Sequence, residues 1–489
     1  MRQYLLGLDN GGTVTKAALF DLSGRQIALA SEPTPVLTPE EGHSERDMQA
    51  LWQANCRVIQ RMVEKAKGSI LALGISGHGK GLYLLDKANR PLGNGIGSTD
   101  TRALPYELQW AKDKTADSVY GKTYQKVMAC QPVALLRWMK DNRPEVYGQI
   151  GAVLSVKDYI RFCLTGKINT EYTDLSGTNL LNLNTRDYDD SLLEAFGIGE
   201  IRNALAPIIR SAEVCGGVSE EAARQTGLAP GTPVAGGMFD IDACAVAMGM
   251  LSPEDLCTIA GTWSINEYIS PVPVGSHMVS MNSLYCDEAF YLAEESSAAS
   301  AGNLEWFKAL LGNQGYAQID SKVQSLPSEE CRLYYLPFLH ASNVNPLAAG
   351  SLIGLKAHHT DAHILRAVME GVAFSHRTHI ERLLQSRKPP KCIRLAGGAA
   401  HSDVWAHIFA DVLGFPLEVI DDTELGCKGA AMAAGIAAGQ YKDFADAAKQ
   451  CVATVKRVDP NPEGVEQYRK KYAVYQAIIS GLDSVWEKL

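Results

Sequence analysis

The chain has 489 residues, 46% of them hydrophobic and 21% charged, and 46 basic against 55 acidic residues give a formal net charge of −9. This length exceeds one ordinary core and predicts two large domains, while the acidic balance argues against a nucleic-acid partner or an anionic membrane surface. The eleven cysteines are scattered without metal-type spacing, and we see neither a signal peptide nor a run of about 18 apolar residues. We therefore expect a cytoplasmic protein with reduced thiols and no membrane contact.

The first half of the chain predicts alternating strands and helices. A strand over 4–9 and an apolar stretch over 16–20 flank a glycine turn and read as a hairpin. An amphipathic helix over 48–65 precedes buried strands over 70–75 and 82–85. The segment 103–229 is mostly helical with polar loops, and an apolar run over 232–237 leads into a small-residue helix over 243–250. This alternation is typical of α/β layers.

The second half repeats the opening pattern. Ser252 and Pro253 mark a natural boundary, after which a strand over 256–260 runs into a glycine–threonine turn. Later elements are a helix from 301, a strand over 333–336, a helix over 362–384, a strand over 393–396 and a helix over 402–413. Two halves that each begin with strand, turn and strand indicate an ancient duplication, with domains over 1–250 and 251–489.

Two turns carry glycine and threonine directly after a strand. In the first, Asp9 ends the strand and Gly11, Gly12 and Thr13 follow; glycines let backbone N–H groups approach phosphate oxygens, and a carboxylate there suits Mg²⁺. The second turn is Gly261 with Thr262. Each turn has an alternative interpretation as a plain hairpin turn. The first is not a Walker A loop, because no GK[ST] follows it.

A third glycine turn opens the helix over 402–413. Gly397, Gly398 and Ala399 would permit the close approach of a flat base, and the start of a helix favours anionic groups. A Rossmann fingerprint would need G-x-G-x-x-G in a leading βαβ unit, which is absent. The alternative is a helix entry that Ser402 caps.

An acid follows the bend at Gly236 and Gly237. Asp240 could project into a cleft, where a carboxylate would accept the proton of an alcohol as its oxygen attacks phosphorus. It could instead cap the following helix, and Asp242 is a rival for the same role. Farther on, the small residues over 424–431 indicate a helix that crosses another closely.

The order of these motifs resembles the actin/hexokinase/Hsp70 superfamily and, within it, the FGGY carbohydrate kinases. Residues 350–355 and 363–370 fit the second signature of that family, and residues 397–405 and 410–414 look like its adenine-side segment. The resemblance runs from Leu5 to about Gly439. It implies an α/β fold of two actin-like (ribonuclease H-like) domains, with the active site in the cleft between them.

The resemblance also implies a reaction and a set of roles. The chain would transfer the γ-phosphoryl group of ATP to a sugar hydroxyl with Mg²⁺ as cofactor. Asp240 would be the catalytic base, because its spacing to Ala243, Ala245 and Gly249 matches the family better than that of Asp242. The other implied residues are Gly11, Gly12, Thr13, Lys16, Gly261, Thr262, Gly397, Gly398, Ala399 and Ser402 for ATP, Asp9 and Asp240 for the metal, and His78, Gly79, Lys80, Asp100 and Asp240 for the sugar.

One segment of the sequence bears on which sugar the chain would bind. D-xylulose kinases of the family carry Gln-Met-His-Gly where this chain reads His78, Gly79, Lys80 and Gly81. The likeness is closest to the kinases of L-xylulose, and the matching stretches are 79–82, 84–87, 132–138, 300–307, 336–339 and 401–405. We expect L-xylulose or a related pentulose as the substrate.

Alternatives to this substrate and to this class of protein stay open. The acceptor could be a keto-sugar acid such as 3-keto-L-gulonate, in which Lys80 would meet a carboxylate, or another sugar or polyol. A different class is a nucleotide-driven binding module of the actin or Hsp70 kind, without a small-molecule acceptor. The sequence leaves the oligomeric state open, including a homodimer.

Overall fold

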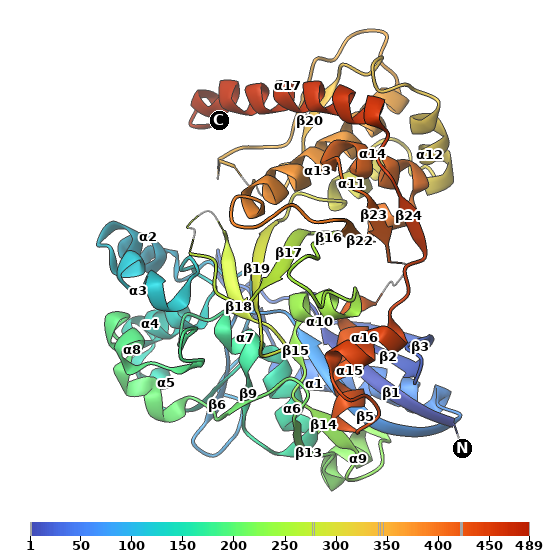
Figure 1. Cartoon of the computed structure of the whole chain (residues 1–489). Coiled ribbons are helices and arrows are strands. Elements are labelled where there is room, and N and C mark those ends of the chain that lie inside the picture. Colours follow the sequence, from blue (N-terminus) through green and yellow to red (C-terminus); the bar gives the residue numbers. More distant parts are fainter. Residues whose placement is uncertain are drawn as a thin grey trace.

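Two seven-stranded sheets organise the chain in the computed structural model (Figure 1). The structure describes residues 2–275, 277, 279–340, 342, 344–345, 347–420 and 424–488. Within these ranges, no helix combines the length and the apolar character needed to cross a bilayer.

The first sheet has the strand order β13-β14-β5-β1-β2-β3, and β15 pairs with the end of β5. Its central strand β1 is buried along most of its length, because helices cover both faces. Strands β1 and β2 form the predicted antiparallel hairpin, whereas β5 and β14 run parallel to β1. The strands are β1 Arg2–Asn10, β2 Val14–Asp21, β3 Gln26–Pro33, β5 Gly68–Gly77, β13 Val214–Gly217, β14 Pro233–Ala235 and β15 Met238–Phe239.

The second sheet repeats this arrangement with the order β18-β19-β17-β16-β22-β23-β24. Strands β16 and β17 form a hairpin, and β22 and β23 run parallel to β16. The predicted duplication of pattern is therefore also a duplication of topology, and the predicted fold class is confirmed. The strands are β16 Cys257–Ala260, β17 Ser264–Ser270, β18 Met281–Leu284, β19 Tyr291–Ser297, β22 Ile393–Gly397, β23 Leu417–Val419 and β24 Lys456–Val458.

Helices α15 and α16 come late in the chain but lie with the first sheet (Figure 1). Helix α15 packs so closely that a Cβ atom on Gly7 would lie 1.8 Å from the carbonyl oxygen of Cys427. On its other side, a Cβ on Gly429 would lie 2.1 Å from the carbonyl oxygen of Ala243 in α10. The close crossing that we predicted for 424–431 is thus confirmed, and it wedges α15 between β1, β5 and α10.

Helices such as α1, α6 and α13 pack against the two sheets, whereas α2, α3, α4, α5 and α8 lie to one side in a group of their own (Figure 1). Helix α1 begins at Met48, where Asp47 accepts a hydrogen bond from the backbone N–H of Ala50. The helix that we expected over 243–250 lies over 240–247, so that Asp240 occupies its first turn, where an acid is favourable. The helices are α1 Met48–Lys65, α2 Leu104–Lys112, α3 Thr115–Thr123, α4 Pro132–Asn142, α5 Pro144–Tyr147, α6 Val156–Thr165, α7 Tyr172–Ser176, α8 Asp190–Ala195, α9 Glu220–Thr226, α10 Asp240–Ala247, α11 Gly302–Leu310, α12 Tyr316–Gln324, α13 Asp361–Leu383, α14 Asp403–Leu413, α15 Leu425–Ala437, α16 Phe444–Cys451 and α17 Pro462–Trp486, with the 3₁₀ helices η1 Gly199–Ala204 and η2 Gly398–His401.

Short strands complete the fold outside the main sheets. The segment 103–229 carries eight of the α-helices, from α2 to α9, as predicted, and short strands of two to five residues lie between them. The short strands outside the two main sheets, in this segment and elsewhere, are β4 Glu45–Arg46, β6 Tyr83–Asp86, β7 Gly95–Ile96, β8 Ile150–Leu154, β9 Thr170–Glu171, β10 Leu181–Asn182, β11 Asp187–Tyr188, β12 Ile208–Ile209, β20 Tyr334–Leu336 and β21 Ser351–Ile353.

Candidate active site

The carboxyl ends of three parallel strands meet at one edge of the first sheet. Asp9 of β1 pairs with Ser76 of β5, and Ser76 pairs with Met238 of β15. His78 and Asp240 lie one step beyond this edge, at the ends of β5 and β15. Open α/β sheets bind ligands at this kind of edge. The sheet therefore gathers a carboxylate, an imidazole and a second carboxylate from segments that are up to 231 positions apart.

Asp9 is enclosed by polar and backbone groups. The Ser76 hydroxyl donates to its Oδ1 over 2.9 Å, and a Cβ on Gly426 would lie 2.8 Å from its carboxyl carbon. Burial raises the pKa of Asp9, although the Ser76 hydrogen bond and the nearby Lys16 act against this rise. The positive charge and hydrogen bonds around Asp9 therefore do not fully offset the cost of burying its ionised carboxylate.

Asp240 stands at the first position of α10 and is partly exposed. Burial and the negative charges of Asp9, Asp174 and Glu294 raise the pKa of Asp240 well above its usual range. Because Glu294 belongs to β19 of the second sheet, Asp240 is close to both halves of the molecule. A raised pKa from desolvation and like charges is typical of catalytic acids and bases.

Asp242, the rival acid, faces a different environment. Its side chain is fully buried. After burial itself, Glu171, Glu267 and Asp174 raise the pKa of Asp242, whereas Asp9 acts on Asp240. The structure thus brings Asp240, rather than Asp242, beside Asp9.

The first glycine turn lies directly after β1. The backbone N–H of Gly11 donates to the carbonyl of Val14, and Gly12 and Thr13 are exposed. The Lys16 ammonium forms an ion pair with Glu424 over 2.9 Å. Burial alone would lower the pKa of Lys16, but the bonds to Glu424 raise it.

A residue that the sequence reasoning missed, Arg46, supports this turn. Its guanidinium donates to the carbonyl of Gly11 over 2.9 Å and also to the carbonyl of Gly12. It comes from β4, which is 34 residues beyond the turn, so that no local pattern marks it.

The second and third glycine turns lie together at the corresponding edge of the second sheet. Ala260 of β16 pairs with Gly397 of β22, so both turns follow the ends of parallel strands. Gly397 has a φ of +87°, and a Cβ there would lie 2.7 Å from the backbone of Ala260, so glycine is required. Near them, Gly302 opens α11 beside Thr262. The structure therefore joins two predicted nucleotide segments that are 135 positions apart.

Two predicted nucleotide residues are engaged by the protein itself. The Ala399 side chain is fully buried in the core of the second half. The Ser402 hydroxyl accepts from the backbone N–H of Trp405, as the capping alternative has it, and donates to Asp320 over 2.8 Å. A role for either in ATP binding stays a prediction.

The segment after β5 carries the predicted sugar residues. Burial and the Arg46 guanidinium lower the pKa of His78 to about 3, so its ring is neutral at physiological pH. The ring nitrogens of His78 lie 3.1 Å from the carbonyl of Gly79 and 3.3 Å from the hydroxyl of Tyr83. A Cβ on Gly79 would lie 2.2 Å from the Phe239 ring. Gly79 thus lets the residue before Asp240 pack against this segment.

Lys80 and Asp100 differ in their freedom to meet a ligand. Lys80 has a φ of +63°, is partly exposed, and lines a small cavity together with Asp174. Asp100 is 1% exposed, and it already accepts from the Ser44 backbone N–H at Oδ2 and from Arg102 in a bidentate pair, Nε to Oδ1 and Nη2 to Oδ2. A direct contact of Asp100 with sugar would have to use its remaining lone pairs, whereas the Lys80 side chain can turn toward a ligand.

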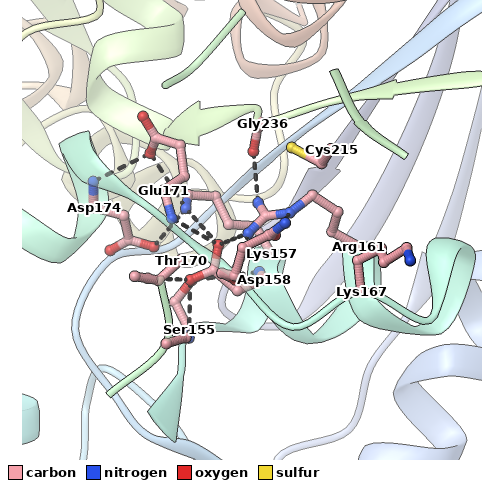
Figure 2. A network of polar contacts seen from close by, with 12 residues as sticks. Ser155, Lys157, Asp158, Arg161, Lys167, Thr170, Glu171, Asp174, Cys215 and Gly236 are labelled. Atoms are coloured by element: carbon pink, nitrogen blue, oxygen red, sulfur yellow. Dashed lines mark hydrogen bonds and ion pairs between the residues drawn. The ribbon is translucent and has the colours of Figure 1, made fainter. Parts of the chain in front are cut away.

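A buried ionic network holds the bend that leads to Asp240 (Figure 2). Arg161 donates to the carbonyl of Gly236 over 2.7 Å, and Lys157 pairs with Glu171 over 3.3 Å. Glu171 accepts from the Thr173 hydroxyl over 2.7 Å, and this hydroxyl accepts from the backbone N–H of Phe239 over 3.0 Å. Sequence reasoning missed this network, because its members come from a helical segment without a marked motif.

Comparisons with known proteins agree with this arrangement. Residues 4–247 match the N-terminal domain of the FGGY family of carbohydrate kinases, and residues 256–438 match its C-terminal domain. The L-xylulose/3-keto-L-gulonate kinase of Escherichia coli K12 is 40% identical over 99% of this chain and 98% of its own. A probable L-xylulose kinase of Pasteurella multocida is 37% identical over 99% of each chain.

A solved structure has the same fold. The ligand-bound xylulose kinase from Lactobacillus acidophilus superposes with a TM-score of 0.91 over 99% of each chain, at 25% identity.

Proposed function

Because this chain belongs to the FGGY family of carbohydrate kinases and is a sugar kinase, we propose that it transfers the γ-phosphoryl group of ATP to a hydroxyl of L-xylulose or a related pentulose. The observation that carries the proposal is the position of Asp240 beside Asp9 at the carboxyl ends of β1, β5 and β15. The relatives that are 40% and 37% identical to the chain are named for L-xylulose.

Asp240 is the proposed general base. As the sugar oxygen attacks the γ-phosphorus, the proton of its hydroxyl passes to the Asp240 carboxylate. The raised pKa of Asp240 makes its carboxylate a good proton acceptor. It also means that the carboxylate needs positive charge nearby to be ionised at neutral pH.

The donors present fit a divalent cation. Two adjacent carboxylates, Asp9 and Asp240, repel one another, and a cation between or beside them would relieve this repulsion. Among the residues that the structure describes, no group of three or more such ligands is assembled. This suits Mg²⁺, which typically takes one or two carboxylates and completes its shell with water and phosphate oxygens. When bound, Mg²⁺ would neutralise charge on the phosphates.

The nucleotide is proposed to lie between the two edges. Gly11, Gly12, Thr13 and Lys16 would approach the phosphates from the first half. The residues proposed to approach from the second half are Gly261, Thr262, Gly397, Gly398, Ala399 and Ser402. In this proposal the domains span 1–250 and 251–489, although α15 and α16 return to the first sheet. We propose a cytoplasmic enzyme without nucleic-acid or membrane partners and with a homodimer as one allowed state.

The sugar pocket is proposed to be formed by His78, Gly79, Lys80, Asp100 and Asp240. A neutral buried imidazole can both donate to and accept from sugar hydroxyls. A lysine ammonium offers three donors and favours an anion. Lys80 therefore supports the second candidate, a keto-sugar acid such as 3-keto-L-gulonate, which also stands in the name of the relative at 40% identity.

An ADP-release assay over a panel of ketoses, aldoses, polyols and sugar acids tests the proposal. We expect ATP turnover to rise most with L-xylulose or 3-keto-L-gulonate and little with D-xylulose. Replacing Lys80 by Met should lower kcat/KM for the sugar acid more than for L-xylulose. If neither L-xylulose nor 3-keto-L-gulonate raised ATP turnover, the proposed substrates would be wrong.

A further inference from the structure

A buried arginine without a carboxylate partner lies beneath the first glycine turn. Arg46 is 3% exposed, and within the described ranges its Nε has no hydrogen-bond partner. Among the residues that the structure describes, its partners are the carbonyl oxygens of Gly11 and Gly12, with no carboxylate in ion-pair contact.

Other buried cations of the first half are paired differently. Lys157 contacts three carboxylates, Arg161 contacts Asp158 over 2.8 Å, and Arg102 contacts Asp100 over 2.8 Å. A buried charge is costly unless it is paired, and two carbonyl dipoles compensate it only in part. The charge of Arg46 is therefore available to an anion that the protein itself does not supply.

The position of Arg46 narrows the choice of anion. Its guanidinium touches the turn proposed to meet the phosphates, and its charge also reaches the His78 ring in the proposed sugar pocket. Strand β4 pairs with β7, and Arg46 stands two residues after Ser44, whose backbone N–H donates to Asp100. Arg46 thus lies between the proposed phosphate and sugar subsites, where the phosphoryl group passes.

We propose that the Arg46 guanidinium binds the γ-phosphoryl group and stabilises the charge on its oxygens during transfer. The inference rests on the proposed function. In the step, a bond forms between the sugar oxygen and the γ-phosphorus, and the bond from that phosphorus to the bridging oxygen breaks. The electron pair of the broken bond leaves with ADP, and the hydroxyl proton goes to Asp240. Arg46 donates hydrogen bonds to a non-bridging oxygen, for which its planar, permanently charged fork is suited.

The test compares Arg46→Gln, which keeps an amide donor but removes the charge, with Arg46→Lys, which keeps a charge. Arg57→Gln is the matched control, since Arg57 is an exposed arginine on α1 that pairs with Glu32. We expect Arg46→Gln to lower kcat by roughly 10²–10³-fold, the effect of removing a transition-state donor. The kcat of Arg46→Lys should lie between those of Arg46→Gln and the native protein, and that of Arg57→Gln should be close to native.

The reduction in kcat should be equal for L-xylulose and 3-keto-L-gulonate. Added guanidinium should restore part of the activity of Arg46→Ala.

A binding measurement separates this role from support of the turn. Without sugar, Arg46→Gln should weaken the binding of ATP more than that of ADP, because only ATP has the γ-phosphoryl group. Equal weakening of both nucleotides, or no weakening, would overturn the inference. So would a loss of activity confined to the sugar acid, which would assign Arg46 to the carboxylate of the acceptor.

Failure of the proposed function would look different. If the native protein phosphorylated no sugar, that proposal would be wrong, while the ratio of ATP to ADP affinity would still decide the role of Arg46. If Arg46→Gln failed to fold, Arg46→Lys and the guanidinium rescue would carry the test.

Discussion

Asp240 and Asp242 show how two identical side chains two positions apart acquire different properties. Helical geometry turns successive residues by about 100°, so these side chains leave α10 in directions about 200° apart. Asp240 meets Asp9, whereas Asp242 is enclosed with Glu171 and Glu267 among its neighbours. Asp240 is partly exposed beside Asp9, as its proposed role requires, whereas Asp242 is part of the interior.

This difference predicts opposite results for two conservative substitutions. Asp240→Asn should lower kcat by roughly 10²–10⁴-fold, the range for loss of a general base, while the Kd for ATP changes little. Asp242→Asn should be mild, because Asp242 is buried away from Asp9 and asparagine nearly matches its shape, while the raised pKa of Asp242 favours the neutral form that asparagine resembles. Steady-state kinetics with nucleotide titrations would measure both. An inactive Asp242→Asn beside an active Asp240→Asn would show that the base is wrongly assigned.

Thr173 links the buried network to the residue before Asp240, so we predict that it positions the base. Thr173→Val removes the acceptor for the Phe239 N–H and the donor to Glu171. An active-site displacement of about 1 Å can lower the rate by about 10²-fold. We expect kcat to fall by roughly 10-fold or more with the KM for ATP unchanged, and Thr173→Ser to recover most of it.

The control for this variant lies in the same network. The Thr170 hydroxyl donates to Asp158 over 2.7 Å without an observed hydrogen bond to the bend. Thr170→Val should therefore change thermal stability more than kcat. Equal effects of Thr170→Val and Thr173→Val on kcat would indicate a general structural role for the network.

Among the elements, α15 depends most on glycine. It approaches β1, β5 and α10 closely because glycines stand at the crossings, Gly7 on β1, Gly74 on β5, and Gly426 and Gly429 on the helix itself. The small residues over 424–431 predicted a close crossing, and the structure shows that it brings a late helix against the strand that ends at Asp9.

Gly429→Ala should consequently destabilise the protein. The new Cβ would lie 2.1 Å from the carbonyl oxygen of Ala243, so α10 or α15 must shift, and overpacking of this kind typically costs about 1–3 kcal/mol. The melting temperature should fall, and kcat should fall with it because α10 carries Asp240. Gly481→Ala on α17 is the control: a Cβ there meets no atom within 4 Å, so alanine should be neutral or stabilising. An unchanged melting temperature for Gly429→Ala would contradict the close packing.

For the whole molecule, buried carboxyls set the response to pH. Burial raises the pKa of Asp174 to about 7, and it also raises those of Asp9, Asp240, Asp242 and Glu267. A carboxyl with a raised folded-state pKa binds its proton more tightly when folded. The free energy of unfolding therefore falls as the pH rises from about 4, the pKa of a carboxyl in the unfolded chain, through the raised pKa that it has in the folded protein.

We accordingly predict that the Asp174 carboxyl contributes a fall in melting temperature between pH 5 and pH 8, while the lowered pKa values of His78 and His376 act in the opposite direction up to about pH 7. Asp174→Asn removes this carboxyl and leaves Lys157 with Asp158 and Glu171, so its melting temperature should fall less over the same interval. Thermal unfolding at several pH values in buffers of equal ionic strength would measure both. If the melting temperature of Asp174→Asn fell more steeply with pH than that of the native protein, the Asp174 carboxyl would be ionised in the folded state throughout this interval.

The sequence by itself determined the repeated pattern of strand, glycine turn and strand, the α/β class, the family and the assignment as a sugar kinase. These depend on local rules: hydrophobic runs make strands, and glycines next to strand ends make tight turns. The roles proposed for Asp240, Asp9 and the glycine turns were also drawn from sequence and stay predictions, which the strand register supports by gathering these residues.

Only the tertiary structure decided which of the predicted site residues are already bonded within the protein. It also decided which residues from distant parts of the chain lie beside them. It engages Ser402 as a helix cap and surrounds Asp100 with donors. It also brings Arg46 beneath a turn 34 positions earlier and returns 425–451 to the first sheet. The physical reason is that burial and pairing depend on contacts across the chain, and no local pattern encodes them.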